Sequence, residues 1–494
     1  MNRVVVQIII FIAIVISACT EKPTNVKAID QLPNIYPDYV GVTIPSTIAP
    51  LNFALVTSNV QSISVSITAS DETTINSSGQ CTDFDIESWH QMLQKSVGDS
   101  IVVSVCAKIN NEWFRYNNFS IYVSADTLSA YGLTYRRIAP GYEVYNHMGI
   151  YQRNISNFDE EPIFDNNELT GSCLNCHSGN RTSATDFLFH VRGENGATVV
   201  SHNNKIDVLN TNTEQTVGSL VYPYWHPNGR YVAFSTNVTR QSFHEVKEKR
   251  LEVFDNASDI AIYDTDTHKL LLSPLFNGTK ESLETFPVFS PDGNKLYYCT
   301  AKAQPIPSGL KDVCYMLCQT TFDAEKGVFG NTIDTLINLT TKHKSVTHPR
   351  PSYDGKYIMF TLSDYGTFPI WHPESDLWLY NVATDSITPL SNANSNDADS
   401  FHNWSADSRW FVFTSRRDDG LYTRLYICHI SANGEVSKPF MLPQRNPKEY
   451  YANLLYSYNT PDFVSAHINF DAKSIAKQLS RSDRQNITPI SQHR

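Results

Sequence analysis

The chain has 494 residues, which is too long for one ordinary hydrophobic core and predicts two or three domains. Its 50 acidic residues outnumber its 39 basic residues, and the formal net charge of -11 argues against nucleic acid or an anionic lipid surface as the partner. With 26 tyrosines, 25 phenylalanines and few long runs of helix-forming residues, the composition predicts a mostly β protein.

The N-terminus has the form of a bacterial lipoprotein leader. Arg3 precedes an apolar run (residues 4–16) that is too short to span a bilayer comfortably, and small residues lead to Cys19. The letters ISAC resemble the lipobox, in which the cysteine is lipidated and becomes the new N-terminus. We therefore predict a signal peptide and lipobox over 1–19, with Cys19 as the lipidation site, and a flexible tether over 20–30. Simple cleavage and secretion is the alternative.

Such a leader predicts location in the bacterial cell envelope, lipid-anchored on the periplasmic side or at the outer-membrane surface. In that oxidising space thiols tend to pair and c-type haem is attached. Cys81 and Cys106 are candidates for one disulfide, and Cys299 with Cys314 or Cys318 for another, although spacing alone leaves the connectivity open.

Residues 31–135 alternate polar and apolar side chains over 60–70 and 99–124, and one short helix is expected over 84–96. This pattern predicts an immunoglobulin-like β-sandwich domain. Residues 136–185 show little periodicity and are expected to form a connector.

The connector contains Cys173-Leu174-Asn175-Cys176-His177, a spacing that suits covalent attachment of one haem c. The thiols of Cys173 and Cys176 would add to the two vinyl groups, and His177 would be the proximal iron ligand. A zinc site would need a second pair of ligands nearby, and a redox dithiol would need a βαβ unit. Neither is visible, so haem is favoured.

The sixth iron ligand is less well defined. His190, on a strand shortly after the motif, and His147 or Met148, shortly before it, are the candidates for the distal position, and an open site is the alternative. A methionine would raise the reduction potential, two histidines would lower it, and an open position would admit small molecules.

Residues 186–465 contain a repeat. The segments 222–237, 286–301, 348–363 and 401–416 each place an aromatic residue before a polar turn and follow it with an alternating strand. About four strands in each unit predict a β-propeller of about five or six blades, with 450–464 supplying the strand that closes the ring. Residues 466–494 are expected to form a C-terminal tail.

These FSPDG-type units resemble the repeats of TolB-type periplasmic propellers, which also occur in relatives of prolyl oligopeptidase. Together with the lipobox and the single haem motif, the chain looks like a TolB-like β-propeller lipoprotein of Bacteroidetes type. That resemblance implies a compartment and a fold rather than a reaction.

Three histidines, His226, His348 and His402, recur close to the repeat turns. They could line one end of the propeller as a metal or substrate site. The favoured interpretation is that they pack or form hydrogen bonds between blades.

The favoured function is a lipid-anchored monohaem c-type cytochrome that transfers electrons in the envelope, with the propeller as docking surface for an unidentified redox or envelope protein. The alternative is a non-enzymatic TolB-like scaffold or protein-binding propeller. We predict no catalytic residues, because no G-x-S-x-G elbow, H-E-x-x-H motif or phosphate loop occurs. A haem enzyme acting at the propeller mouth is a third hypothesis.

Overall fold

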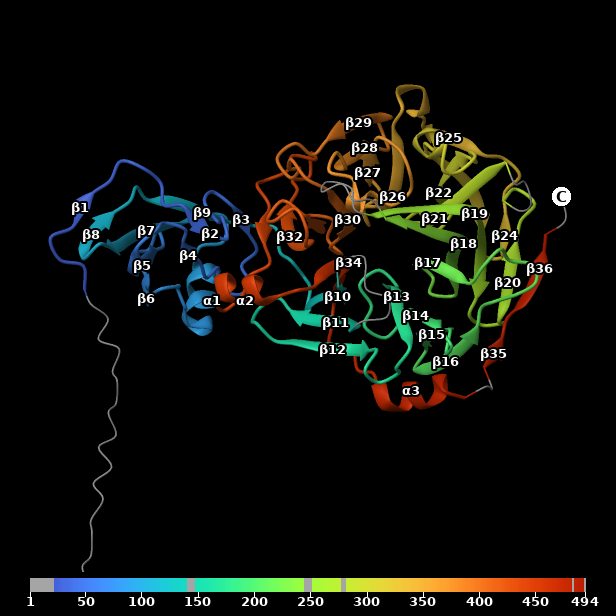
Figure 1. The fold of residues 1–494 in the computed structure, drawn as a ribbon, viewed down its shortest axis with the longest axis horizontal. Coiled ribbons are helices and arrows are strands. Elements are labelled where there is room, and N and C mark those ends of the chain that lie inside the picture. The colour runs from blue at the N-terminus through green and yellow to red at the C-terminus, as the bar shows by residue number, and fades with distance from the viewer. Residues whose placement is uncertain (1–21, 140–146, 244–250, 277–280, 482–483, 493–494) are drawn as a thin grey trace, which may run out of the picture.

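A computed structural model describes residues 22–139, 147–243, 251–276, 281–481 and 484–492, and it shows a propeller with a smaller N-terminal β-domain at one side (Figure 1). The predicted mostly β class is confirmed, and the blades number six. The signal peptide and Cys19 lie outside the described residues. No helix among the described residues is long and apolar enough to cross a membrane.

The N-terminal domain is built on one seven-stranded sheet. Its strands are β1 (Lys27–Ala28), β3 (Thr43–Ile44), β5 (Val60–Thr68), β6 (Thr74–Gly79), β7 (Ser100–Ile109), β8 (Glu112–Arg115) and β9 (Phe119–Val123). Side chains alternate between the two faces of the sheet, and β5 buries Ile63 and Val65 on one face. On neighbouring strands, Val102 of β7 and Tyr122 of β9 are 39% and 51% exposed.

The buried face of that sheet shares its core with α1 (Ile86–Lys95), which begins at the N-cap Asp85 and buries Trp89. The other sheet described in this domain, β2 (Ile35–Tyr36) with β4 (Ala54–Leu55), has two residues per strand. The domain is therefore a one-sided sheet covered by a helix and loops, and it differs from the predicted sandwich of two comparable sheets.

The N-terminal domain shares one hydrophobic core with the last two blades and with the strands that close the ring. This core includes Trp410, Phe413 and Phe463 as well as the domain's own residues. Polar contacts add to this junction. Tyr39 Oη donates to the carbonyl of Met441 (3.3 Å), and His429 Nε2 lies 2.7 Å from Asp126 Oδ2. The domain is thus packed against the propeller rather than joined to it by a linker alone.

Each blade is an antiparallel sheet whose first or closing strand lies at the centre of the ring (Figure 1). Blades 2 and 3 comprise β13 (Ser172–Gly179), β14 (Phe187–Gly193), β15 (Ala197–His202) and β16 (Lys205–Asn210), then β17 (Leu220–Trp225), β18 (Tyr231–Phe243), β19 (Leu251–Asp264) and β20 (Lys269–Leu272). Blade 4 comprises β21 (Ser282–Phe289), β22 (Lys295–Lys302), β23 (Met316–Asp323), β24 (Val328–Phe329) and β25 (Asp334–Ile337). Blades 5 and 6 comprise β26 (Ser345–Pro351), β27 (Tyr357–Ser363), β28 (Asp376–Asn381) and β29 (Ser386–Pro389), then β30 (Asp399–Trp404), β31 (Trp410–Ser415), β32 (Arg424–His429) and β33 (Phe440–Met441).

Blade 1 joins the two ends of the propeller. Its strands β10 (Gly132–Ile138), β11 (Met148–Asn154) and β12 (Glu160–Asp165) precede the other blades in sequence, and its innermost strand β34 (Ser457–Val464) follows them. Pairing of β10 with β34 closes the ring, as expected for 450–464. Residues 136–185, expected to be a connector, instead supply strands of blades 1 and 2.

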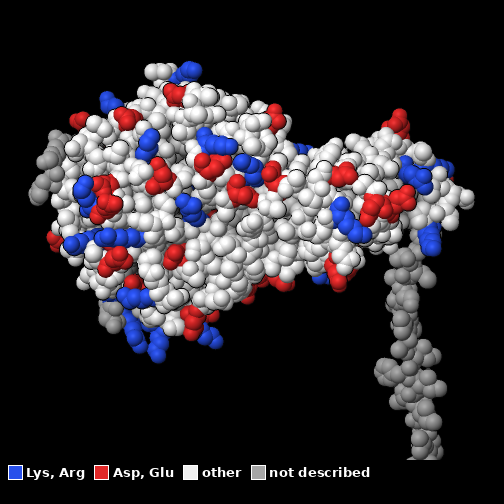
Figure 2. Space-filling model, turned by 180° about the vertical axis from the view of Figure 1, so that it is seen from behind, with Lys and Arg blue, Asp and Glu red and all other residues white. Residues whose placement is uncertain are grey.

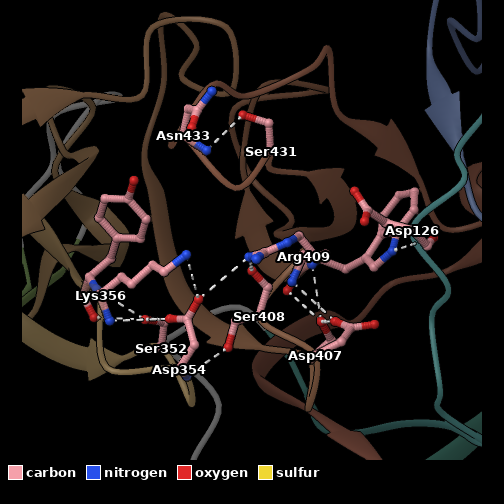
Figure 3. Close-up of polar contacts among 12 residues, drawn as sticks. Asp126, Ser352, Asp354, Lys356, Asp407, Ser408, Arg409, Ser431 and Asn433 are labelled. Atoms are coloured by element: carbon pink, nitrogen blue, oxygen red, sulfur yellow. Dashed lines mark hydrogen bonds and ion pairs between the residues drawn. The ribbon is translucent and has the colours of Figure 1, made fainter.

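The repeat turns are held by side chains. In blade 5, Ser352 Oγ donates to Asp354 Oδ1 (2.7 Å) and accepts from the Tyr357 N–H (3.0 Å), while Gly355 supplies a positive φ of 73° (Figure 3). The Ser–Asp pair recurs at Ser290 with Asp292 and at Ser405 with Asp407. The S-x-D pattern is thus a turn motif, with glycine at the next position in blades 4 and 5 and Ser408, at a positive φ of 57°, in blade 6.

Neighbouring turns also contact each other. The Asp354 N–H donates to Ser408 Oγ (3.1 Å), and Arg409 Nη1 lies 3.5 Å from Asp354 Oδ2, so the turns of blades 5 and 6 are joined (Figure 3). Asp126 of the N-terminal domain reaches the same region. These contacts hold the last blades in register with each other.

Residues 466–494 form more than a tail. Helix α3 (Ala472–Leu479) packs in a core shared by blades 1 and 2. After it, β35 (Gln485–Asn486) pairs with β16, and β36 (Thr488–Ser491) pairs with β20. The segment therefore covers the outer edges of blades 2 and 3 along the rim (Figure 1).

All eight described cysteines are free thiols, so neither expected disulfide is formed. Seen from behind, Lys and Arg are interspersed with Asp and Glu over the visible face, and the negative net charge is not gathered there into one patch (Figure 2).

The closing strand gives a first prediction. Phe463 on β34 is fully buried, so Phe463→Ala should lower the free energy of unfolding by about 3–5 kcal/mol in urea denaturation. Leu455, just before the same strand, is 63% exposed, and Leu455→Ala should change it by less than about 0.5 kcal/mol. Equal effects of the two substitutions would contradict the role of β34 as the closing strand.

A candidate ligand-binding channel

The six innermost strands, β34, β13, β17, β21, β26 and β30, contact one another in that order and surround the propeller axis. Each is interrupted by a β-bulge, where its register against the second strand of the blade shifts. Each bulge has one residue in the left-handed region. These residues are Cys176, Tyr222, Phe286, His348, Phe401 and Thr460, with φ between 47° and 53°.

A left-handed conformation is costly for a residue with a side chain, and a bulge redirects the side chain at that point. Here all six left-handed residues line the central channel. The residue that follows is proline in four strands, at 223, 287, 349 and 461, and histidine in two, at 177 and 402. The motif Cys176-His177 therefore occupies the repeat position of Phe401-His402.

The channel has two chambers. The first chamber lies toward the ends of the innermost strands and is lined by the bulge residues with Tyr224, Tyr353 and Arg350. The second chamber lies toward the beginnings of these strands, has a volume of about 300 Å³, and is lined by Cys173, Arg192 and Trp371 among others. Residues such as Arg136, Asn175, Tyr222 and Asn459 line both.

The structure places the predicted haem residues on β13 rather than in a connector. Cys173 faces the second chamber, where Arg136 Nη2 lies 3.4 Å from its sulfur, whereas Cys176 and His177 line the first chamber. Covalent haem needs both thiols at the edge of one porphyrin and the imidazole over its face. Cys173 and Cys176 line different chambers, and protein encloses both ring nitrogens of His177, so the arrangement does not fit that group.

The burial of the His177 ring is explained by its position in the repeat and needs no haem. Its two ring nitrogens are buried without a side-chain partner, and so are those of His402, which belongs to no cysteine motif. Burial lowers the pKa of both imidazoles to about 3. Backbone groups of the preceding blade oppose this shift, at Thr134 for His177 and at Met359 for His402. A neutral, buried ring is thus a property of this repeat position.

The distal candidates are held by other groups. His147 Nε2 lies 2.7 Å from Asp165 Oδ2, and His190 Nδ1 lies 3.0 Å from Thr198 Oγ1. Met148 contacts Arg136, with 3.6 Å between its sulfur and Nη2. Only Met148 shares a chamber with a residue of the motif, namely Cys173.

The three recurring histidines occupy three different repeat positions. His348 is a bulge residue stacked on Phe286 (4.0 Å between ring centroids), and His402 is the next position in its own strand. His226 replaces the turn serine, and its Nε2 donates to the Gly293 carbonyl of the next blade (3.0 Å). In the described ranges, no three His, Cys, Asp or Glu side chains group to hold a metal ion.

Charged groups reach the channel from several blades. In the first chamber, burial raises the pKa of Asp462 to about 7, and the positive charge of the Arg350 guanidinium opposes this rise. Arg350 and Arg181 lie over the rings of Tyr224 and Tyr353, at 5.5 and 5.6 Å from the centroids. Aromatic faces and guanidinium groups therefore converge in one cavity.

Sequence reasoning missed most of these residues. The sequence analysis does not predict Arg136, Tyr222 or Arg350 as site residues, although Tyr222 and Arg350 lie in the repeat segments 222–237 and 348–363. Alignment of the four repeats on the aromatic or histidine position before the turn would have pointed to Tyr222 and Arg350, whereas Arg136 lies outside these repeats.

No protein-family model matches the chain, and no curated protein matches it. Among solved structures, the putative TolB of Agrobacterium tumefaciens is 14% identical over 67% of this chain and 98% of its own, with a TM-score of 0.35. Oligogalacturonate lyase of Vibrio parahaemolyticus is 10% identical (58% and 85% of the chains, TM-score 0.31). Prolyl oligopeptidase B of Galerina marginata is 11% identical (63% and 44%, TM-score 0.36).

The buried histidines give a pH prediction. His402 stays neutral in the fold to about pH 3 but takes up a proton near pH 6.5 when unfolded, so it lowers stability as the pH falls between these values. Relative to His402→Gln, wild type should lose about 1.4 kcal/mol of unfolding free energy per pH unit in this window. Urea denaturation at pH 7, 6, 5 and 4 measures it, and a difference that is constant with pH would contradict a buried neutral ring.

Proposed function

We propose that the chain is a lipid-anchored binding protein of the bacterial cell envelope that takes its ligand into the central channel of the propeller. The channel supports this proposal most directly, since six bulged strands direct aromatic, amide and guanidinium groups into it. Concave sites with mostly apolar walls and a few polar groups are typical of small-molecule binding. The N-terminal domain would act as the spacer between the lipid and the propeller.

This proposal shares the non-enzymatic binding propeller with the scaffold alternative, but it assigns a small-molecule ligand where that alternative had a protein partner, and it departs from the cytochrome. The two thiols of the Cys-x-x-Cys-His motif lie in separate chambers, so no electron-transfer step is derived from a haem.

The ligand site can be tested by filling the first chamber. Asn403 on β30 lines that chamber, and within the described part of the chain its side chain accepts only from the neighbouring Trp404 N–H, so Asn403→Trp adds bulk without removing a described contact between blades. After incubation with an extract of envelope small molecules, native mass spectrometry should find a bound species on wild type and not on Asn403→Trp.

Asn396→Trp is the matched control, because Asn396 is exposed on a loop away from the channel. It should retain the bound species as wild type does. Retention by Asn403→Trp at the wild-type level would refute the channel as the ligand site.

The anchor is tested at Cys19. Cys19→Ser should remove the lipid, because lipidation needs the thiol, and should move the protein from the membrane fraction to the soluble fraction. Cys81→Ser, which alters a half-buried free thiol, is the control and should stay in the membrane fraction. An unchanged intact mass and unchanged fractionation of Cys19→Ser would exclude a lipobox.

A further inference from the structure

We propose that the second chamber is a binding site for the carboxylate of a small organic acid with an apolar body, held by Arg136 and Arg192. The inference rests on the proposed function and deepens it, because it assigns a ligand class to one part of the same channel.

Arg136, on β10, is 8% exposed and lines both chambers. Its guanidinium donates to Asn175 Oδ1 (3.3 Å) and to the sulfurs of Cys173 and Met148 (3.4 and 3.6 Å), while its Nε has no partner. Sulfur is a weak acceptor. No carboxylate of the described residues lies within ion-pair distance of this charge.

Other buried arginines of the chain are satisfied differently. Arg153 donates to the carbonyls of Phe158 and Pro443, both at 2.7 Å, and Arg424 donates to three backbone carbonyls. Both brace chain segments that are distant in sequence. Arg136 also reaches a distant segment, at Asn175 and Cys173, but among the described residues it donates to no backbone carbonyl, and two of its three acceptors are sulfur atoms.

Arg192, on β14, faces the same chamber, and its Cα is paired in the sheet with that of Cys173. The carboxylate that acts on it electrostatically is Asp255, whose two oxygens already accept from Asn237 and Thr239 (both 2.7 Å). Among the described residues, the two guanidinium groups therefore share at most one carboxylate.

A buried charge without a counter-charge destabilises the fold unless an anion compensates it. Guanidinium groups bind carboxylates through paired hydrogen bonds, and the amides of Asn175 and Asn459 add further donors at the same point. The remaining walls include Val253, Ile370 and Trp371, which suit an apolar body better than a phosphate.

The test uses benzoate, with benzamide as its neutral isostere and inorganic phosphate as the other anion, on the full-length protein. Benzoate should raise the melting temperature and give a calorimetric binding isotherm, whereas benzamide and phosphate should not. Binding should weaken at least about tenfold in Arg136→Met, because a hydrogen bond to a charged group is lost.

Without benzoate, Arg136→Met should melt no lower than wild type, a result that a bracing arginine would not give. Arg192→Gln tests the site separately if Arg136→Met fails to fold. Arg115→Gln, at an exposed position of β8 in the N-terminal domain, is the control for unspecific attraction and should bind like wild type.

Equal responses to benzoate and benzamide, unchanged binding in both second-chamber variants, or a response to phosphate alone would each overturn the inference. If benzoate does not bind but Asn403→Trp still abolishes ligand retention, the carboxylate site is refuted and the proposed function stands.

Discussion

The propeller depends on one backbone constraint, the left-handed residue in each of its six innermost strands. A left-handed residue with a side chain costs roughly 1 kcal/mol, and the chain bears this cost six times around one axis. Four of the six positions are followed by proline, whose fixed φ and missing N–H suit an interrupted ladder. The bulges therefore belong to the repeat, and the channel is the space that they define.

That constraint explains why chemically reactive residue types gather at the axis without forming a reactive group. Cys176, His348 and Thr460 are equivalent by position, as are His177, His402 and the four prolines. Burial keeps the imidazoles of His177 and His402 neutral by lowering their pKa. Arg136 differs from them because it comes from a second strand, and its charge lacks the compensation that other buried groups have.

Much of the fold could be predicted from the sequence because turns and alternation are local signals. Asp292 and Asp354 follow serines that cap the same tight turn, and the strands after them alternate. Residues 136–185 were not recognised as strands, because the first blade lacks the Asp-Gly turn and is completed only by β34, far away in sequence. The N-terminal domain was predicted as β but not as a one-sided sheet, since alternation does not reveal what covers a face.

The site could be predicted only in part. Cys173, Cys176 and His177 do reach the channel, but a spacing read along the chain cannot show that a bulge turns two thiols toward different chambers. Arg136 and Arg192 have few counter-charges among the described residues, and no sequence pattern marks this, because it arises from the packing of blades 1 and 2.

The assignment of the Cys-x-x-Cys-His motif to a propeller strand is tested most directly by producing the protein with a c-type haem maturation system and measuring its intact mass and visible spectrum. If Cys173, Cys176 and His177 belong to a bulged propeller strand, the mass will carry no added haem and the pyridine haemochrome spectrum will show no band. Covalently attached haem would contradict the assignment of these residues to the repeat.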